Sequence, residues 1–207
     1  MLAFHNSVRS IALFLLFSHL AATASAAESE RWRYGVKARM GGRYDNVRMC
    51  VATDPGVNGG PAMDISLSFV RSVGAKSVIE FDLPAMRPLL FGAAFTMVPF
   101  EPSVTLKFTL IESTTYALAV GPMLGVSLHY GPDKDSDLSG SDRTASFLAA
   151  GPMAGAYAGV TFKRPRGWFD LQVGVTLYGT PLFSIQDDED HSGYVLGGSL
   201  DIGLLFR

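Results

Sequence analysis

Residues 116–130, YALAVGPMLGVSLHY, alternate between two kinds of side chain along their whole length. Every second residue from Tyr116 to Tyr130 is apolar, and the residues between them, apart from Met123, are small or polar. Strict alternation with a period of two indicates a β-strand, because successive side chains of a strand point to opposite faces. A soluble sandwich strand would bury its bulky face. Here that face has a tyrosine at each end, which is typical of a strand that faces lipid between two aromatic girdles.

The same alternation recurs along the chain, at 32–49, 62–73, 77–86, 103–111, 145–162, 168–182 and 193–206. Together with 116–130, these segments predict an all-β fold, an antiparallel up-and-down transmembrane β-barrel of eight strands. A closed barrel is required because lipid cannot hydrogen-bond to a free strand edge. We expect the short connections 112–115 and 163–167 on the periplasmic side and the longer, acidic ones, 131–143 and 184–192, outside.

The front half of the chain leaves the strand count open. Residues 86–100 are expected to be a long second connection, because their apolar residues fit helical spacing as well as strand spacing. If 43–53 and 89–98 are instead separate strands, the barrel has ten strands. We favour eight, since this count leaves the polar segments in loops.

The N-terminal segment predicts export. Arg9 precedes an apolar run, and Ala24-Ser25-Ala26 fits the small-x-small rule for signal peptidase, so residues 1–26 are expected to be a cleaved signal peptide and 27–207 the barrel domain. Cys50 is the single cysteine, which excludes an internal disulfide, and the net charge of −2 argues against nucleic-acid binding. An exported, apolar chain without a second long apolar run fits a membrane barrel.

This pattern resembles that of small outer-membrane β-barrel proteins of Gram-negative bacteria, such as the OmpA transmembrane domain, OmpX and OmpW. The resemblance covers the whole mature chain and is one of pattern, without a family motif. It implies localisation in the cell outer membrane, contact with outer-membrane lipid and lipopolysaccharide, and recognition of the last strand by the barrel-insertion machinery. That assembly signal usually ends on an aromatic residue, whereas here Phe206 is followed by Arg207.

The inward faces of the predicted strands carry charges of both signs. They are Arg33, Lys37, Arg39, Asp64, Glu80, Asp82, Lys107, Asp170 and Asp201. Side chains can fill the interior of an eight-stranded barrel, and isolated buried ions cost several kcal/mol each. We therefore expect a salt-bridge network in a filled polar lumen, and a non-enzymatic protein with a structural or surface-interaction role, its external partner unknown. The alternative is a narrow pore or transporter for small solutes.

A lipid-modifying enzyme is a further alternative. Lipid A deacylases of the PagL type are similar in size and fold and use a His-x-Ser pair with a distant Glu. In this chain Ser127 comes before His129, the reverse of that order. His191 is followed directly by Ser192, without the intervening residue of the His-x-Ser pair. Ser127 and His129 share the inward face, away from lipid, so we expect a polar lumen residue at His129 and no catalytic site. A soluble, lipocalin-like ligand carrier is disfavoured because its large apolar residues would face inward.

The acidic connections offer one weak metal motif. Asp133, Asp135 and Asp137 have the spacing of calcium ligands, but an EF-hand requires Gly and Glu where this chain has Leu138 and Thr144. A second acidic run, DDED, occupies 187–190. We interpret both as solvated loops, and expect no bound metal and no cofactor.

Gly-Pro-Met-x-Gly occurs at 121–125 and again at 151–155. If the intervening hairpin is centred on Asp137, Pro122 lies opposite Pro152 and each methionine lies inward against the first glycine of the other motif. Large against small would suit a crowded lumen. Two prolines at one height would interrupt the hydrogen-bond ladders and bend the sheet.

Overall fold

The computed structural model describes residues 32–45, 60–86, 98–132, 146–164, 166–185 and 193–207. The strands are β1 (Arg33–Asp45), β2 (Gly60–Gly74), β3 (Ser77–Pro84), β4 (Val98–Phe100), β5 (Ser103–Glu112), β6 (Tyr116–Pro132), β7 (Ser146–Phe162), β8 (Phe169–Ser184) and β9 (Gly193–Phe206). No helix among these residues is long and apolar enough to traverse a bilayer. The expected signal peptide lies outside the described residues and stays a prediction.

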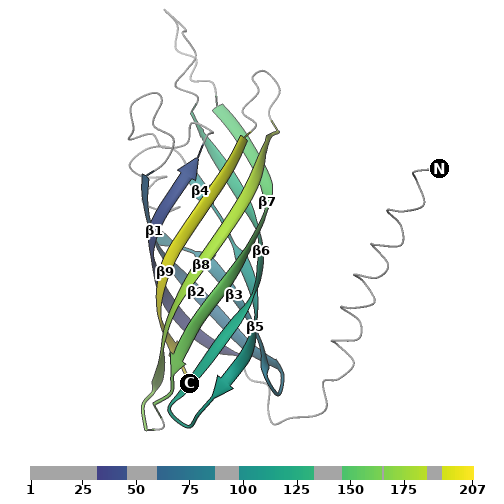
Figure 1. Cartoon of the computed structure of the whole chain (residues 1–207). Helices are drawn as coiled ribbons and strands as arrows, with labels where there is room; N and C mark the ends of the chain where they lie inside the picture. Colours follow the sequence, from purple (N-terminus) through teal and green to yellow (C-terminus); the bar gives the residue numbers. More distant parts are fainter. Residues whose placement is uncertain (1–31, 46–59, 87–97, 133–145, 165, 186–192) are drawn as a thin grey trace, which may run out of the picture.

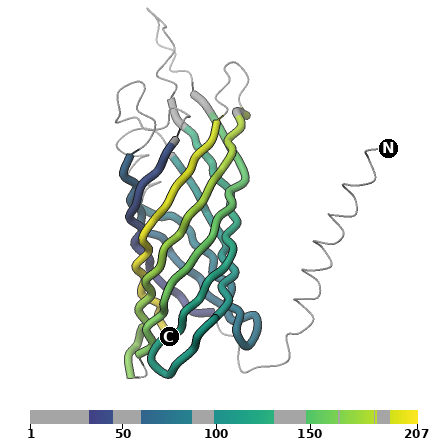
Figure 2. Tube along the Cα trace, in the orientation of Figure 1, coloured from purple at the N-terminus to yellow at the C-terminus, as the bar shows by residue number. Residues whose placement is uncertain are grey.

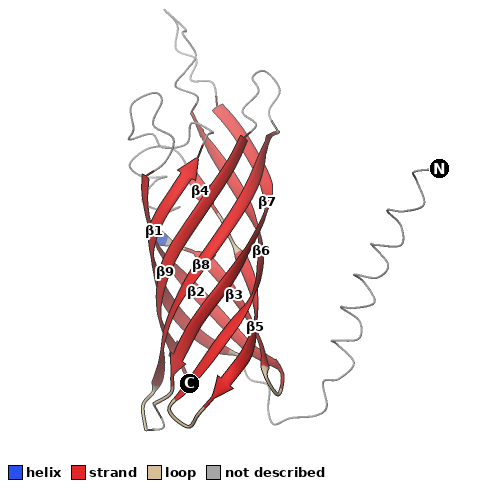
Figure 3. Cartoon of the chain, in the orientation of Figure 1, coloured by secondary structure: helices blue, strands red, loops and turns tan. Residues whose placement is uncertain are grey.

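The strands form one closed antiparallel barrel (Figures 1 and 2). Neighbours in sequence pair with one another except around β4: β3 pairs with β5, and β4 pairs with β6. β9 pairs with β1 and closes the sheet. Short turns join the strands at the end where the chain terminates, which we call the turn end. β1, β6 and β8 end, and β2, β4, β7 and β9 begin, towards the opposite end, which we call the loop end (Figure 3).

β4 and β5 are two parts of one interrupted strand. Phe100 lies opposite Leu128 and Ser103 lies opposite Gly125, so the same register against β6 continues across the break. Pro102 has no N–H to give to the ladder, which explains the interruption. Counted in this way the barrel has eight strands, as predicted. The expectation that all of 86–100 is a connection is wrong for 98–100, while 87–97 lie outside the described residues.

The outer surface is apolar and ends in aromatic rings at two heights. Exposed rings at the turn end belong to Trp32, Tyr34, Tyr116, Phe162 and Trp168; those at the loop end belong to Tyr44, Tyr130, Phe183 and Tyr194. Along β1, Tyr34 and Tyr44 are separated by ten residues. At about 3.3 Å per residue and a tilt of about 40°, that separation spans about 25 Å along the barrel axis. This height matches the apolar band of an outer-membrane barrel, about 25 Å.

The predicted register of the Gly-Pro-Met motifs is wrong by four residues. Pro122 lies opposite Ala156, and Pro152 lies opposite Val126. Pro132 pairs with Ser146, so the hairpin is centred on Ser139 and not on Asp137. The two methionines do lie inward against glycines, but against the last glycine of the other motif, with Met123 opposite Gly155 and Met153 opposite Gly125.

The first glycine of each motif approaches the strand on the other side of its own strand, not the other motif. This explains why the observed β6–β7 register differs from the predicted one. A Cβ on Gly121 would clash with the Leu106 carbonyl of β5, and one on Gly151 with the Pro181 carbonyl of β8. Pairing between β5 and β6 is interrupted around Pro122, and pairing between β7 and β8 around Pro152. Each Gly-Pro therefore allows an irregular, close approach of the outer neighbour, and each final glycine makes room for a methionine.

Candidate functional site: the charged lumen

Ion pairs cross the middle of the lumen. Lys37 Nζ contacts Glu80 and lies 2.9 Å from Asp82 Oδ2, while Lys107 Nζ lies 2.6 Å from Glu80 Oε2. Arg39 Nη2 lies 2.6 Å from Asp82 Oδ2. These side chains come from β1, β3 and β5, and we call Lys37, Arg39, Glu80, Asp82 and Lys107 the central network. Because each carboxylate has two cationic partners, the network forms one connected cluster.

Neutral and charged groups from β9, β8 and β7 complete the central network. Asp201 on β9 lies 3.8 Å from Arg39 Nε and accepts hydrogen bonds from Thr176 Oγ1 at 2.6 Å and Ser199 Oγ at 2.7 Å. The Lys107 ammonium lies 4.1 Å from the centre of the Tyr157 ring on β7. With Asp201, three cations face three carboxylates. These six charges balance, and Lys37, Glu80, Asp82, Lys107 and Asp201 are buried.

A smaller ion cluster lies at the turn end. Asp170 forms two ion pairs there. Its Oδ2 lies 3.2 Å from Arg33 Nη1, and its Oδ1 lies 2.6 Å from Arg207 Nη2. Of the nine charged residues predicted for the lumen, seven thus lie in the central network or the turn-end cluster, and Asp201 lies beside Arg39 of the central network. Asp64 lies nearer the loop end, where one of its carboxylate oxygens accepts a hydrogen bond from the Ile65 amide.

A third cluster lies towards the loop end, and sequence reasoning missed two of its members. Glu101 Oε1 lies 2.8 Å from Arg43 Nη1, 2.9 Å from Ser127 Oγ and 3.1 Å from His129 Nε2. We call these four residues the upper cluster. Arg43 continues the odd-numbered inward face of β1, and Glu101 that of β5. The alternation therefore includes both residues, but the predicted strand begins only at 103, after Glu101, and Arg43 lies where the sequence leaves the strand bounds open.

The upper cluster does not have the geometry of a catalytic triad. Ser127 Oγ lies 2.7 Å from His129 Nε2, and the Glu101 carboxylate contacts that same nitrogen. In a triad the carboxylate holds the opposite ring nitrogen, so that the histidine can take the serine proton. Both Ser127 and His129 are fully buried. The arrangement joins β1, β6 and the segment between β4 and β5 inside the barrel.

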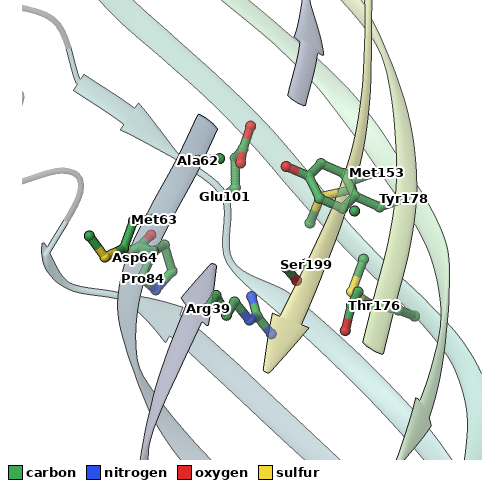
Figure 4. A pocket seen from close by; sticks show the side chains of 12 residues that line it. Arg39, Ala62, Met63, Asp64, Pro84, Glu101, Met153, Thr176, Tyr178 and Ser199 are labelled. Atoms are coloured by element: carbon green, nitrogen blue, oxygen red, sulfur yellow. The ribbon is translucent and has the colours of Figure 1, made fainter. Parts of the chain in front are cut away.

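A small cavity separates the central network from the upper cluster. Its volume is about 40 Å³, room for about three water molecules. Figure 4 shows Arg39 at one side and Glu101 at the other, with Asp64, Tyr178 and Met153 around them. Because of this cavity, the upper half of the lumen is less completely filled than the middle.

The predicted metal motif cannot be placed. Asp133, Asp135 and Asp137 lie outside the described residues. Within the described ranges, no group of three or more His, Cys, Asp or Glu side chains could hold a metal ion.

Comparisons with known proteins give a likeness of fold. No protein-family model matches the chain, and no curated protein matches its sequence. Among solved structures, Neisserial surface protein A covers 87% of this chain and 99% of its own, with a TM-score of 0.56 and 11% identity. The N-terminal β-barrel domain of Pseudomonas aeruginosa OprF covers 85% and 100%, with a TM-score of 0.40 and 10% identity. Ail of Yersinia pestis covers 86% and 99%, with a TM-score of 0.41 and 12% identity. The chain therefore has the fold of a small outer-membrane β-barrel.

Proposed function

We propose that this chain is an integral protein of the bacterial outer membrane with a closed lumen and a non-enzymatic, structural or surface-interaction role. The observation that carries the proposal is the central network, which fills the barrel with buried, balanced ion pairs. In this proposal the turn end faces the periplasm and the loop end faces outside. The polar connections of the loop end would meet lipopolysaccharide or an external partner.

The outer face supports the membrane location. Leu67, Leu124, Leu177 and Leu196 are among the large aliphatic side chains exposed between the two aromatic levels. A water-soluble protein rarely exposes a continuous apolar surface of this size, whereas lipid would cover it at no cost.

The central network supports the closed lumen. A hydrated ion passing this level would have to separate Lys37 from Glu80 and Asp82, whose side chains are 0–3% exposed. Leaving a buried charge without its partner costs about 3–5 kcal/mol, which would make such an opening rare. The second candidate is a narrow pore, and the cavity above the network is the observation that favours it.

Cell fractionation tests the location. We expect the protein in the outer-membrane fraction, resistant to carbonate extraction, with a heat-modifiable shift in gel mobility. An epitope inserted between Asp137 and Leu138 should bind antibody on intact cells, and one inserted after Ala75 only after lysis. A protein found in the soluble periplasmic fraction, or the reverse pattern of epitope access, would contradict the proposal.

A further inference from the structure

The outer surface of the turn end carries an excess of positive charge. Arg71, Lys76, Lys163, Arg164 and Arg166 lie there, and Glu112 is the one carboxylate at this level on the outside of the described barrel. Glu112 lies 2.5 Å from Lys163. Five cations against one carboxylate give this surface a net positive charge. At the loop end, by contrast, the described residues present no lysine or arginine on the outer face, since Arg43 points into the lumen.

These cations lie beside aromatic rings. The Arg71 guanidinium lies 5.8 Å from the centre of the Trp32 ring, and that of Arg164 lies 4.8 Å from the centre of Phe169. Phe169 meets Trp168 edge to face at 5.0 Å, and Trp168 is 69% exposed. Arginine stems that run along interfacial rings hold their charge at the level of lipid headgroups. Stacking uses the flat face of the Arg164 guanidinium and leaves its N–H edge for an anion.

The cations form two groups on different sides of the barrel, not a single patch. Arg71 lies on β2, and Arg164 lies in the turn between β7 and β8. In the closed sheet, β3, β5 and β6 separate β2 from β7 on one side, and β1, β9 and β8 on the other. The two arginines thus lie on opposite sides of the molecule. One protein partner docking from the side could not reach both, whereas the lipids around the barrel contact every side.

We propose that Arg71, Lys76, Arg164 and Arg166, which we call the basic collar, bind the phosphate groups of anionic phospholipids in the leaflet at the turn end. This inference rests on the proposed membrane location. In the orientation proposed above, that leaflet is the inner one of the outer membrane. Anionic headgroups gather next to the barrel there, and they hold the turn end at the headgroup level.

The chain contains its own probe for this proposal. Its two tryptophans, Trp32 and Trp168, both lie at the turn end, next to Arg71 and Arg164 respectively. The full-length mature protein is reconstituted into phosphatidylcholine vesicles that contain the same fraction of either brominated phosphatidylglycerol or brominated phosphatidylcholine. Bromine quenches tryptophan at short range, so the difference in quenching measures the enrichment of the anionic lipid beside the basic collar.

We expect an enrichment of about fivefold for each direct contact at low salt. The enrichment should shrink as salt rises, because the charges lie at the aqueous boundary. The variant Arg71→Gln/Arg164→Gln should lose most of it. The matched control, Lys134→Gln/Arg143→Gln, removes the same charge from the connection between β6 and β7 and should keep it. A heat-modifiable gel shift shows that each variant is folded.

The outcomes separate this proposal from the one on which it rests. Equal quenching by both brominated lipids would overturn the basic collar and leave the membrane location intact. An acidic periplasmic protein would then replace the lipid as the candidate partner of this surface. Absence of quenching by either lipid would show that the protein does not insert, and would overturn both proposals.

Discussion

The middle and the upper part of the lumen solve the same packing problem in different ways. The middle is filled by ion pairs whose charges balance, and Lys37, Glu80 and Asp82 are each at most 3% exposed. The upper part contains Met123, Met153 and the upper cluster, and a cavity of about 40 Å³ remains between them. Methionine adapts to irregular space, whereas a buried ion requires its partners at fixed positions.

This difference indicates that the middle of the barrel determines both its closure and much of its stability. A change there removes a partner that no solvent can replace. A change in the upper part can be compensated by water in the cavity or by movement of a methionine. Four comparisons of variants test this contrast, from the largest expected effect to the smallest.

Lys37→Met should have the largest effect, because it leaves Glu80 and Asp82 with fewer cations in a buried site. We expect a loss of about 3–5 kcal/mol in the free energy of unfolding. Arg43→Met in the upper cluster, next to the cavity, should cost less than half as much. Urea unfolding of both proteins in lipid vesicles, followed by tryptophan fluorescence, measures the difference. Equal losses would contradict the contrast between the two levels.

Gly151→Ala tests the close approach of the barrel wall at the Gly-Pro-Met motifs. Its Cβ would clash with the Pro181 carbonyl, a backbone atom, so we expect a loss of about 3 kcal/mol, the upper end of the range for an overpacked site. Gly42→Ala is the matched control, because no atom lies within 4 Å of its added Cβ, and its effect should stay within about 0.5 kcal/mol. If both variants unfold at the same urea concentration, the close approach at Gly151 is refuted.

Ser68 and Ser66 make a closer comparison, since both are buried on the inward face of β2. Ser68 Oγ donates to Asp82 Oδ1 at 2.5 Å, whereas Ser66 Oγ has no hydrogen-bond partner in the described chain. We expect Ser68→Ala to cost about 1.5–3 kcal/mol, the range for a hydrogen bond to a charged group, and Ser66→Ala to be nearly neutral. The same unfolding assay decides, and the opposite ranking would contradict the assignment of Ser68 to the central network.

Glu112→Gln should have the smallest effect. The pair with Lys163 lies at the turn end, and the Glu112 side chain is 53% exposed. An exposed ion pair contributes less than about 1 kcal/mol, and salt weakens it further. An effect as large as that of Lys37→Met would show that burial does not explain the strength of the central network.

The sequence predicts the barrel well where its alternation is regular. The strand count, the outward apolar face and the inward position of Lys37, Glu80 and Lys107 all follow from a period of two. The interrupted strand shows the limit of that signal. Pro102 breaks the ladder, and the segment before it fits two periodicities, so Glu101 was not recognised as a lumen residue.

The register of the β6–β7 hairpin shows a second limit. Alternation fixes which face a residue occupies, but a shift by any even number of residues preserves it. The pairing depends on which glycine makes room for Met123, and that depends on the approach of β5 and β8 from the other side. These contacts join residues far apart in the sequence. The register therefore cannot be predicted from the Gly-Pro-Met motif or from the length of the connection between β6 and β7.

Single-channel recording in planar bilayers tests the central claim most directly. With the ion pairs of the central network in place, the folded protein should give no stable current above the background of a protein-free bilayer. Stable, ion-selective openings of the native protein would contradict a closed lumen and would establish the narrow pore in its place.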